Sequence, residues 1–388
     1  MTRPSFQSGF FLGIFVSLGY LLLLHCQDFA EASPESVGIH SSGLRDLSEW
    51  VRGEELDVRS MIVIRNGQIA LEWYSGDVTR AHNHNIFSVT KTVVSALAGI
   101  AIDQKVISGI DETLGDLYPE VSDPEMEEAS LENLLTMRSG LPQSRGNFLS
   151  GPEKELFDRL HASTNRLKSI FELPMNGTPG SKFLYSNIDP QLVLSAVERK
   201  TDQNGLAFAQ STLFKALEFE NAEWVYADKA GNLPGGYGLR LRAIDLAKLG
   251  QLFLQNGEWN RQQVISSEWV QAATTNQTES GYGYFWWIVR SPEGQKAYAA
   301  KGVRGQQLFV DPSHKLVFAV TSDLPPKRVS EIMKQLNERL MLAVEKSSDA
   351  LPEASEENRK LEKELGKASD YEPTQRKGLI PARLPRVP

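Results

Sequence analysis

The chain has 388 residues, of which 41% are hydrophobic, which is enough for a sizeable globular body. Its 49 acidic residues exceed its 41 basic ones, and the net charge of -8 argues against nucleic-acid binding. The single cysteine, Cys26, excludes an internal disulfide, a thiolate metal cluster in the body and a cysteine nucleophile. Covalent chemistry in this chain must therefore use oxygen or nitrogen.

Residues 1–32 have the pattern of an export signal. Arg3 precedes an uncharged stretch whose residues 9–24 are almost wholly apolar, and Ala30-Glu31-Ala32 follows as a small-x-small cleavage pattern. We expect cleavage after this tripeptide. An uncleaved membrane anchor is the alternative, because the apolar stretch approaches the length that spans a bilayer, and a lipoprotein attached through Cys26 is a third option. Each option directs the body out of the cytoplasm, to the periplasm or the medium, with this segment as its only contact with a membrane.

The rest of the chain predicts an α+β fold. Residues 38–52 have the spacing of an amphipathic helix, and two β-rich runs, 59–65 and 68–74, flank an Asn-Gly pair that indicates a hairpin. Helical spacing dominates from about residue 89 to 281. β-rich runs return near the end, at residues 285–290, 306–310 and 315–321. A helical pattern at residues 329–344 follows them. We expect one antiparallel sheet flanked by the N- and C-terminal helices, with a mainly helical lobe inserted at about residues 105–280.

The body therefore spans residues 33–345, and the composition changes after it. Residues 346–388 are charged, contain several prolines and hold few large apolar side chains. This composition predicts a disordered tail, although residues 353–365 could form a charged helix.

The segment that carries chemistry begins at Phe87-Ser88-Val89-Thr90-Lys91 and continues as an apolar run to Ile102. A helix there places Ser88 and Lys91 on one face, one turn apart. Burial lowers the pKa of a lysine, and a neutral amine can take the proton of a serine hydroxyl. By itself the spacing also fits a helix-capping serine and a solvated lysine.

Further motifs accompany this pair in a characteristic order. They are Pro34-Glu-Ser-Val-Gly38, Leu134-Leu-Thr-Met-Arg-Ser-Gly-Leu141, Thr178-Pro-Gly180, Tyr185-Ser-Asn187, Gly235-Gly-Tyr-Gly-Leu239 and Gly281-Tyr-Gly-Tyr-Phe-Trp-Trp287. With them, residues 34–344 resemble the serine β-lactamase-related family, in its class C β-lactamase, DD-peptidase and esterase branch. The resemblance implies a β-lactamase/transpeptidase-like fold.

The resemblance also implies roles for single residues. Ser88 resembles the acylated nucleophile, Lys91 its proton acceptor, and Tyr185 the group that passes the proton to the leaving group and back from water. Asn187 resembles the side chain that binds the substrate or Lys91. Gly302 precedes Val303, whose backbone N–H would form an oxyanion hole with that of Ser88.

The third family motif departs from the pattern. β-Lactamases and DD-peptidases have Lys or His, then Thr, then Gly, whereas this chain has Ala300-Lys301-Gly302. Alanine cannot bind a substrate carboxylate there. The Gly302-x-x-Gly305-Gln306 pattern resembles instead the esterases and the 6-aminohexanoate-dimer hydrolases, and it makes Gln306 a candidate substrate-binding residue.

The sequence thus predicts an exported serine hydrolase that cleaves an ester or amide through an acyl-enzyme on Ser88. A cell-wall DD-peptidase or β-lactamase is the alternative among enzymes, and a catalytically idle envelope-binding protein is the alternative from another class. We expect this reaction to need no cofactor and no metal.

Overall fold

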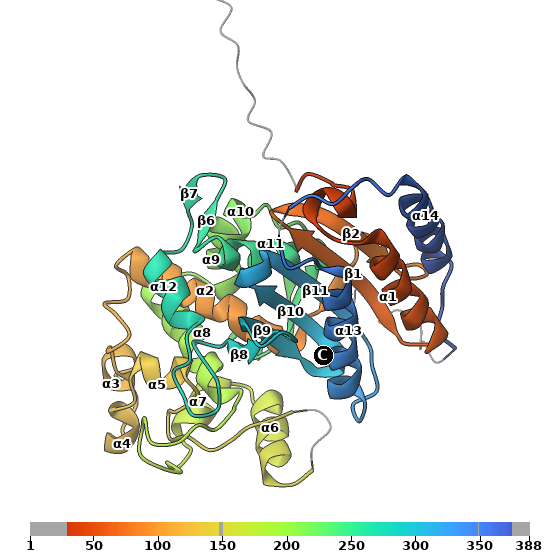
Figure 1. Ribbon diagram of the computed structural model, residues 1–388. Helices are drawn as coiled ribbons and strands as arrows, with labels where there is room; N and C mark the ends of the chain where they lie inside the picture. Colours follow the sequence, from red (N-terminus) through yellow and green to blue (C-terminus); the bar gives the residue numbers. More distant parts are fainter. Residues whose placement is uncertain (1–28, 147–149, 348, 375–388) are drawn as a thin grey trace, which may run out of the picture.

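The computed structural model describes residues 29–146, 150–347 and 349–374. Its centre is a six-stranded antiparallel sheet in the order β2-β1-β11-β10-β9-β8 (Figure 1). The strands are β1 (Val58–Arg65), β2 (Gln68–Tyr74), β8 (Trp287–Arg290), β9 (Lys296–Gly302), β10 (Gln306–Asp311) and β11 (Leu316–Ser322). The early hairpin and the late strands therefore form one sheet, as the sequence predicts.

The hairpin between β1 and β2 closes through Asn66 and Gly67. Arg65 pairs with Gln68, so the loop has two residues, and both have positive φ, 53° and 74°. This is the backbone that a two-residue hairpin requires and that the Asn-Gly pair favours.

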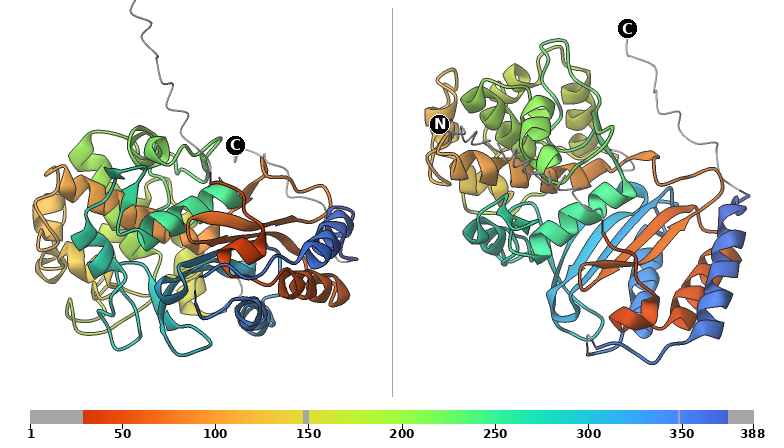
Figure 2. Two further views of the ribbon diagram at one scale, coloured as in Figure 1. Left: turned by 45° about the horizontal axis from the view of Figure 1, so that its top comes forward. Right: turned by 90° about the horizontal axis from the view of Figure 1, so that it is seen from above.

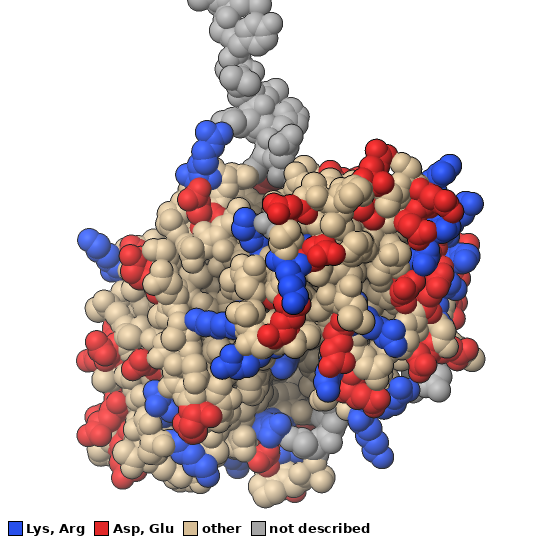
Figure 3. Space-filling model, in the orientation of Figure 1, with Lys and Arg blue, Asp and Glu red and all other residues tan. Residues whose placement is uncertain are grey.

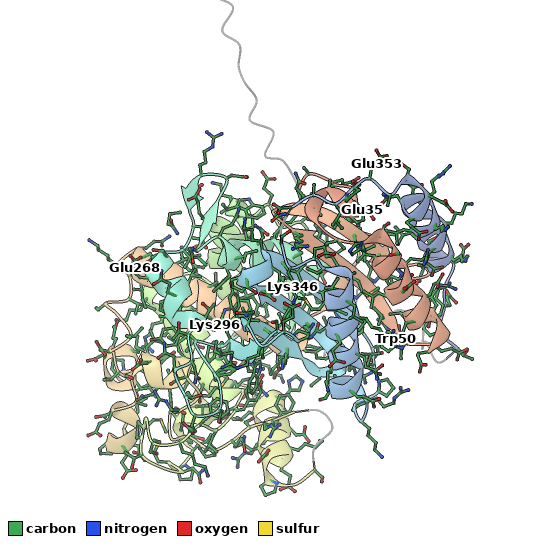
Figure 4. The ribbon with its side chains drawn as sticks, viewed as in Figure 1. Glu35, Trp50, Glu268, Lys296, Lys346 and Glu353 are labelled. Atoms are coloured by element: carbon green, nitrogen blue, oxygen red, sulfur yellow. The ribbon has the colours of Figure 1, made fainter. Side chains whose placement is uncertain are left out.

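One face of the sheet is covered by helices from both ends of the chain. They are α1 (Ser41–Gly53), α13 (Val329–Ala343) and α14 (Ser355–Ser369), and both views in Figure 2 show them in one layer. Trp50, labelled in Figure 4, joins α1 to α13, because the guanidinium of Arg339 lies 4.5 Å from its ring centroid. Leu44, Leu336 and Phe318 belong to the core between this layer and the sheet.

Helix α14 corrects the prediction of a disordered tail. Leu361 and Ala368 are buried against the α1 layer, and the Glu364 carboxylate receives two hydrogen bonds from Arg52, at 2.6 and 2.8 Å. At the start of the helix Asn358 donates to Glu35, which Figure 4 marks at the same end of this layer as Glu353. Ion pairs and hydrogen bonds thus make much of the contact between α14 and α1, because this segment has few apolar side chains to bury. The basic end of the predicted tail, residues 375–388, lies outside the described residues.

The opposite face of the sheet packs against the helical lobe. The buried helix α2 (Thr90–Asp103) enters the lobe and α11 (Ala243–Leu254) returns to the sheet, where it packs on β11, β1 and β10 (Figure 2). The other helices are α3 (Leu114–Leu117), α4 (Pro124–Glu127), α5 (Leu131–Leu135), α6 (Pro152–Ala162), α7 (Arg166–Phe171), α8 (Ile188–Thr201), α9 (Gly205–Ser211), α10 (Leu213–Ala216) and α12 (Ser267–Ala273).

Small strands and single turns complete the lobe and its junctions with the sheet. A three-stranded sheet joins β3 (Asn83–Asn85), β5 (Leu239–Arg242) and β4 (Glu223–Trp224), and β6 (Glu258–Trp259) pairs with β7 (Gln262–Gln263). The 3₁₀ turns are η1 (Pro34–Val37), η2 (Phe87–Val89), η3 (Val303–Gly305) and η4 (Pro312–His314). Turn η2 leads into α2, and η3 joins β9 to β10.

The expected export signal falls largely outside the described residues, which begin at Phe29. Ala30 and Ala32, in the expected cleavage pattern, hydrogen-bond through their backbones to Ile69 at the edge of β2, at 2.9 Å each. Within the described part of the chain, no helix is both long and apolar enough to cross a membrane. Cleavage and anchoring both remain predictions.

Candidate active site

Ser88 lies in the η2 turn that leads into α2. The preceding residue, Phe87, has a positive φ of 45°, and its backbone N–H donates to the Asn85 side chain at 2.9 Å. This sharp turn places Ser88 directly before α2, a helix that is almost entirely buried. The positive end of that helix therefore lies beside the hydroxyl.

Lys91 follows one turn later, and its amine is enclosed by neutral oxygens. The amine nitrogen (Nζ) lies 3.1 Å from Ser88 Oγ and donates to the Asn187 side-chain oxygen at 2.7 Å and to the Gly236 carbonyl at 2.8 Å. Only 1% of the residue is exposed. Each hydrogen of the amine thus has an oxygen within reach, and none of these three oxygens belongs to a carboxylate.

The enclosure shifts the proton affinity of Lys91. Burial lowers its pKa to about 7, because the charged form loses hydration. The charge of Asp189 opposes this shift, and that of Arg145 adds to it. Asp189 is itself buried on α8, and burial raises its pKa to about 7 although the Ser139 hydroxyl donates to it at 2.8 Å. Near neutral pH a large fraction of the amine is therefore uncharged.

Tyr185 lies beside both groups. Its hydroxyl is close enough to the Ser88 side chain to be affected by it, and its ring centroid is 4.9 Å from the Lys91 amine. The ring stacks on Trp287, with centroids 5.5 Å apart. Burial raises the pKa of Tyr185 to about 12, while the Ser88 side chain and the charge of Arg145 lower it. The phenol is protonated at neutral pH and can donate.

Two glycines allow the backbone to approach the amine. A Cβ on Gly236 would lie 2.5 Å from the Asn187 side-chain oxygen, and one on Gly235 would lie 1.9 Å from the Pro190 carbonyl. At Gly235 a larger residue would have to move the α8 backbone, and at Gly236 it would displace the Asn187 side chain that binds Lys91. The Gly235-Gly236 pair therefore allows the Gly236 carbonyl to reach the Lys91 amine.

The β9 strand and the η3 turn form the wall of the Ser88 cleft that faces the helical lobe. A Cβ on Gly302 would lie 2.7 Å from the Ile86 carbonyl, so glycine lets the strand pass close to the turn that carries Ser88. Val303 then lines the cleft beside Ser88. Ala300 is buried in the core on the helical-lobe side, whereas Lys301 lines a groove with α13 on the other face.

Gln306 does not lie where the sequence places it. It is 3% exposed, and its amide nitrogen donates to the carbonyls of Val303 and Ser322 while its oxygen accepts from the Ser322 N–H. Its hydrogen-bonding capacity is used by the backbone, and it is not among the residues that line the Ser88 cleft. The structure corrects the expected substrate contact to a support of the η3 turn.

The cleft that opens over Ser88 has a volume of about 370 Å³. Its lining residues are Ser88, Arg145, Gly146, Tyr185, Asn187, Val303, Arg304, Pro326, Val329 and Ser330. In Figure 3 the surface is hollowed between the helical lobe and the side that carries α13, with Lys and Arg side chains on the rim. The structure thus gathers Ser88, Lys91, Tyr185, Asn187 and Val303 at one cleft.

Some neighbours of the reacting groups escape sequence reasoning. Asp189 follows the Tyr-Ser-Asn motif by two residues, a spacing that could have indicated it, whereas nothing local indicates Arg145. Among the described residues, no three His, Cys, Asp or Glu side chains are grouped so as to hold a metal ion.

Residues 55–340 match the family model described as Beta-lactamase. The chain belongs to the β-lactamase family. Members of the β-lactamase family are serine hydrolases, and the fold of this chain is the β-lactamase/transpeptidase-like fold that the sequence predicts. The match spans the sheet, the helical lobe and most of α13, and it ends before α14.

Relatives within the β-lactamase family differ in their named activities. The chain is 22% identical over 303 residues to the 6-aminohexanoate-dimer hydrolase of Paenarthrobacter ureafaciens, covering 73% of this chain and 76% of the relative. It is 21% identical over 387 residues to an Escherichia coli (strain K12) protein named "Putative D-alanyl-D-alanine carboxypeptidase", covering 79% and 88%. The solved structure titled "Putative 6-aminohexanoate-dimer hydrolase from Bacillus anthracis" superposes with a TM-score of 0.67 at 19% identity, covering 81% of this chain and 86% of that one.

Proposed function

We propose that this protein hydrolyses an ester or amide through an acyl-enzyme on Ser88. The observation that carries the proposal is the buried Lys91 amine, 3.1 Å from Ser88 Oγ and with a pKa lowered to about 7. Most lysines that only stabilise a fold lie in solvent or bind a carboxylate. This one meets the hydroxyl of a helix-terminal serine.

In the acylation step, the neutral Lys91 amine takes the proton of Ser88 as Oγ bonds to the substrate carbonyl carbon. The tetrahedral intermediate places a negative charge on the former carbonyl oxygen, and the backbone N–H groups of Ser88 and Val303 would bind it. Tyr185 donates its proton to the departing alcohol or amine and recovers one from Lys91. The bond to the leaving group breaks, and the acyl group stays on Ser88.

Deacylation uses the same groups in reverse. Water passes a proton to Tyr185, which passes its own to the neutral Lys91 amine, as the water oxygen bonds to the acyl carbon. Lys91 then returns a proton to the Ser88 oxygen as the bond between that oxygen and the acyl carbon breaks. Asn187 holds the Lys91 amine in place through its hydrogen bond at 2.7 Å. The step releases the carboxylic acid and restores the free enzyme.

Hydrolysis is tested with p-nitrophenyl butyrate. We expect Ser88→Ala to abolish turnover and Lys91→Ala to lower kcat/KM nearly as far, because the two residues act as a unit. Arg159→Met, on an exposed position of α6, is the control and should retain wild-type activity. Activity within tenfold of wild type in either active-site variant would contradict the mechanism, whereas an inactive wild type with intact folding would favour the envelope-binding alternative.

We further propose that the body works outside the cytoplasm. The proposal is supported by Arg3, the apolar residues 9–24 and the cleavage pattern Ala30-Glu31-Ala32. Fractionation of cells that express the full chain, with N-terminal sequencing, tests it. A mature chain that begins at Ser33 in the periplasm or medium supports cleavage, a membrane-bound chain that retains Met1 supports the anchor, and a cytoplasmic full-length chain contradicts both.

A further inference from the structure

Among the residues that the structure describes, those that line the cleft over Ser88 include two arginines and no acidic residue. Arg145 comes from the loop that follows α5 in the helical lobe, and Arg304 comes from the η3 turn on the sheet side. The other lining groups are neutral apart from the reacting residues. A substrate in this cleft therefore meets positive charge from two walls.

The two arginines differ in their partners. Arg304 forms an ion pair with Asp323 at hydrogen-bonding distance, so a carboxylate is in direct contact with its charge. Arg145 has Glu153 as an ion-pair partner at 3.8 Å, which is too long for a hydrogen bond, and 43% of its side chain is exposed. Arg145 is thus the less compensated cation at the cleft.

Strand β9 offers no replacement for the family cation. Ala300 is 2% exposed and packs in the core, and Lys301 lines the groove with α13 on the opposite face of β9. Strand β9 itself therefore contributes no cation to the cleft lining. A cation on the facing, helical-lobe wall would hold a negatively charged substrate in a different place.

We propose that Arg145 is a specificity-determining residue that binds a carboxylate group of the substrate from the helical-lobe wall of the cleft. The inference rests on the proposed hydrolysis and adds to it the charge of the preferred substrate. Guanidinium groups bind carboxylates through charge-assisted and often paired hydrogen bonds, which favours this anion over a neutral group of the same size.

The pKa shifts of Lys91 and Tyr185 agree with a position of Arg145 near the reacting groups. The positive charge of Arg145 lowers the pKa of both Lys91 and Tyr185, after the larger effects of burial, so the guanidinium acts within range of the reacting groups. A bound carboxylate would compensate that charge. The pKa of Lys91 should therefore be higher in the complex with an anionic substrate than in the complex with a neutral one.

The test compares two matched pairs of esters. The first pair is mono-p-nitrophenyl glutarate and p-nitrophenyl valerate, which differ by a carboxylate on the acyl side. The second pair is p-butyryloxybenzoate and phenyl butyrate, which differ by a carboxylate on the leaving group. In wild type we expect kcat/KM to favour the anionic member of at least one pair by about 10- to 100-fold, mainly through KM.

Variants assign the preference to Arg145. Arg145→Met should lose the preference, measured as the ratio of kcat/KM between the anionic and the neutral member of the pair, and Arg145→Lys should retain part of it because the charge remains. Arg159→Met removes the same charge from the same lobe outside the cleft and should retain the whole preference. In wild type, the acid limb of the kcat profile should lie at higher pH for the preferred anionic ester than for its neutral partner, a readout that needs no variant.

The outcomes separate the two proposals. If wild type favours neither anionic ester, or if Arg145→Met retains the preference, the role of Arg145 is wrong and the hydrolase proposal stands. A preference lost equally in Arg145→Met and Arg159→Met also contradicts it, because net charge would then explain the effect. If wild type turns over none of the four esters and Ser88 resists acylation, the proposed function itself fails.

Discussion

Two buried cations of this molecule, Lys91 and Arg242, have opposite surroundings. Arg242 ends β5, is 6% exposed and donates twice to the Asp245 carboxylate, at 2.8 and 2.7 Å, and also binds Glu220. Lys91 is 1% exposed, and its three oxygen neighbours within hydrogen-bonding distance are a hydroxyl, an amide oxygen and a backbone carbonyl. Both cations lie inside the protein, but only one has its charge neutralised by direct contact.

The difference separates a structural charge from a reactive one. Arginine cannot lose its proton at physiological pH, so its charge stays when it is buried, and in Arg242 two carboxylates compensate it. Lysine can become neutral, and enclosure by neutral oxygens makes that form accessible near pH 7. Lys91, which is buried without a carboxylate hydrogen bond, is therefore a candidate base, whereas Arg242, which is paired with carboxylates, supports the fold.

The largest expected effect follows from exchanging the two kinds of cation. Lys91→Arg keeps a positive charge beside Ser88 but provides no neutral base, so kcat/KM for p-nitrophenyl butyrate should fall by about 1000-fold or more. Steady-state kinetics with the folded variant measure the loss. Activity close to wild type would show that the charge of Lys91, and not its proton acceptance, serves the reaction.

Arg242→Met tests the structural member of the comparison. The change leaves Asp245 buried without its partner, so the free energy of unfolding should fall by about 3–5 kcal/mol. Urea denaturation measures the loss, and the protein that remains folded should keep its kcat/KM, since Arg242 does not line the cleft. Unchanged stability, or lost activity at full stability, would contradict the assignment.

The pH dependence of activity should report the lowered pKa of Lys91. The amine must be neutral to accept a proton, so kcat/KM should rise with pH through a pKa of about 7. The negative charge of Asp189 raises the pKa of Lys91, and Asp189→Asn should therefore move this limb to lower pH. A limb that stays in place, or that moves to higher pH, would contradict the coupling.

The smallest expected effect concerns α14. Burial disfavours the charged form of Glu364, but hydrogen bonds from Arg52 and Ser48 outweigh it and lower the pKa below its ordinary value. This carboxylate therefore stabilises the fold above the unfolded-state pKa, and the benefit disappears as the pH falls through the lower folded-state pKa. Glu364→Gln should cost about 1–3 kcal/mol at pH 7 by urea denaturation. The deficit should shrink in acid, and a pH-independent deficit would contradict the ionic origin.

Local patterns explain which parts could be predicted from the sequence. The Asn66-Gly67 hairpin and the proximity of Ser88 to Lys91 depend on neighbours within four residues, so spacing alone indicates them. The Gly236 carbonyl lies 145 residues from Lys91 along the chain, and only the folded lobe brings it to the amine. Sequence reasoning therefore finds the pair but not its enclosure.

The errors have physical causes of the same kind. Gln306 has a side chain suited to substrate binding, but the free backbone groups of Val303 and Ser322 take up its amide. Helix α14 buries few apolar side chains, and its position depends on ion pairs with α1 that composition does not reveal. Arg145 lies in a loop, where no periodicity indicates which side chains face a cleft.

The most direct test of the central claim is intact-mass spectrometry after treatment with a fluorophosphonate, followed by peptide mapping. A serine activated by a neutral lysine should displace fluoride and gain one phosphonyl group, located on Ser88, while Ser88→Ala gains none and Lys91→Arg gains it far more slowly. Labelling of Ser88→Ala at the wild-type rate, or of Lys91→Arg as fast as wild type, would contradict the account that Lys91 activates Ser88.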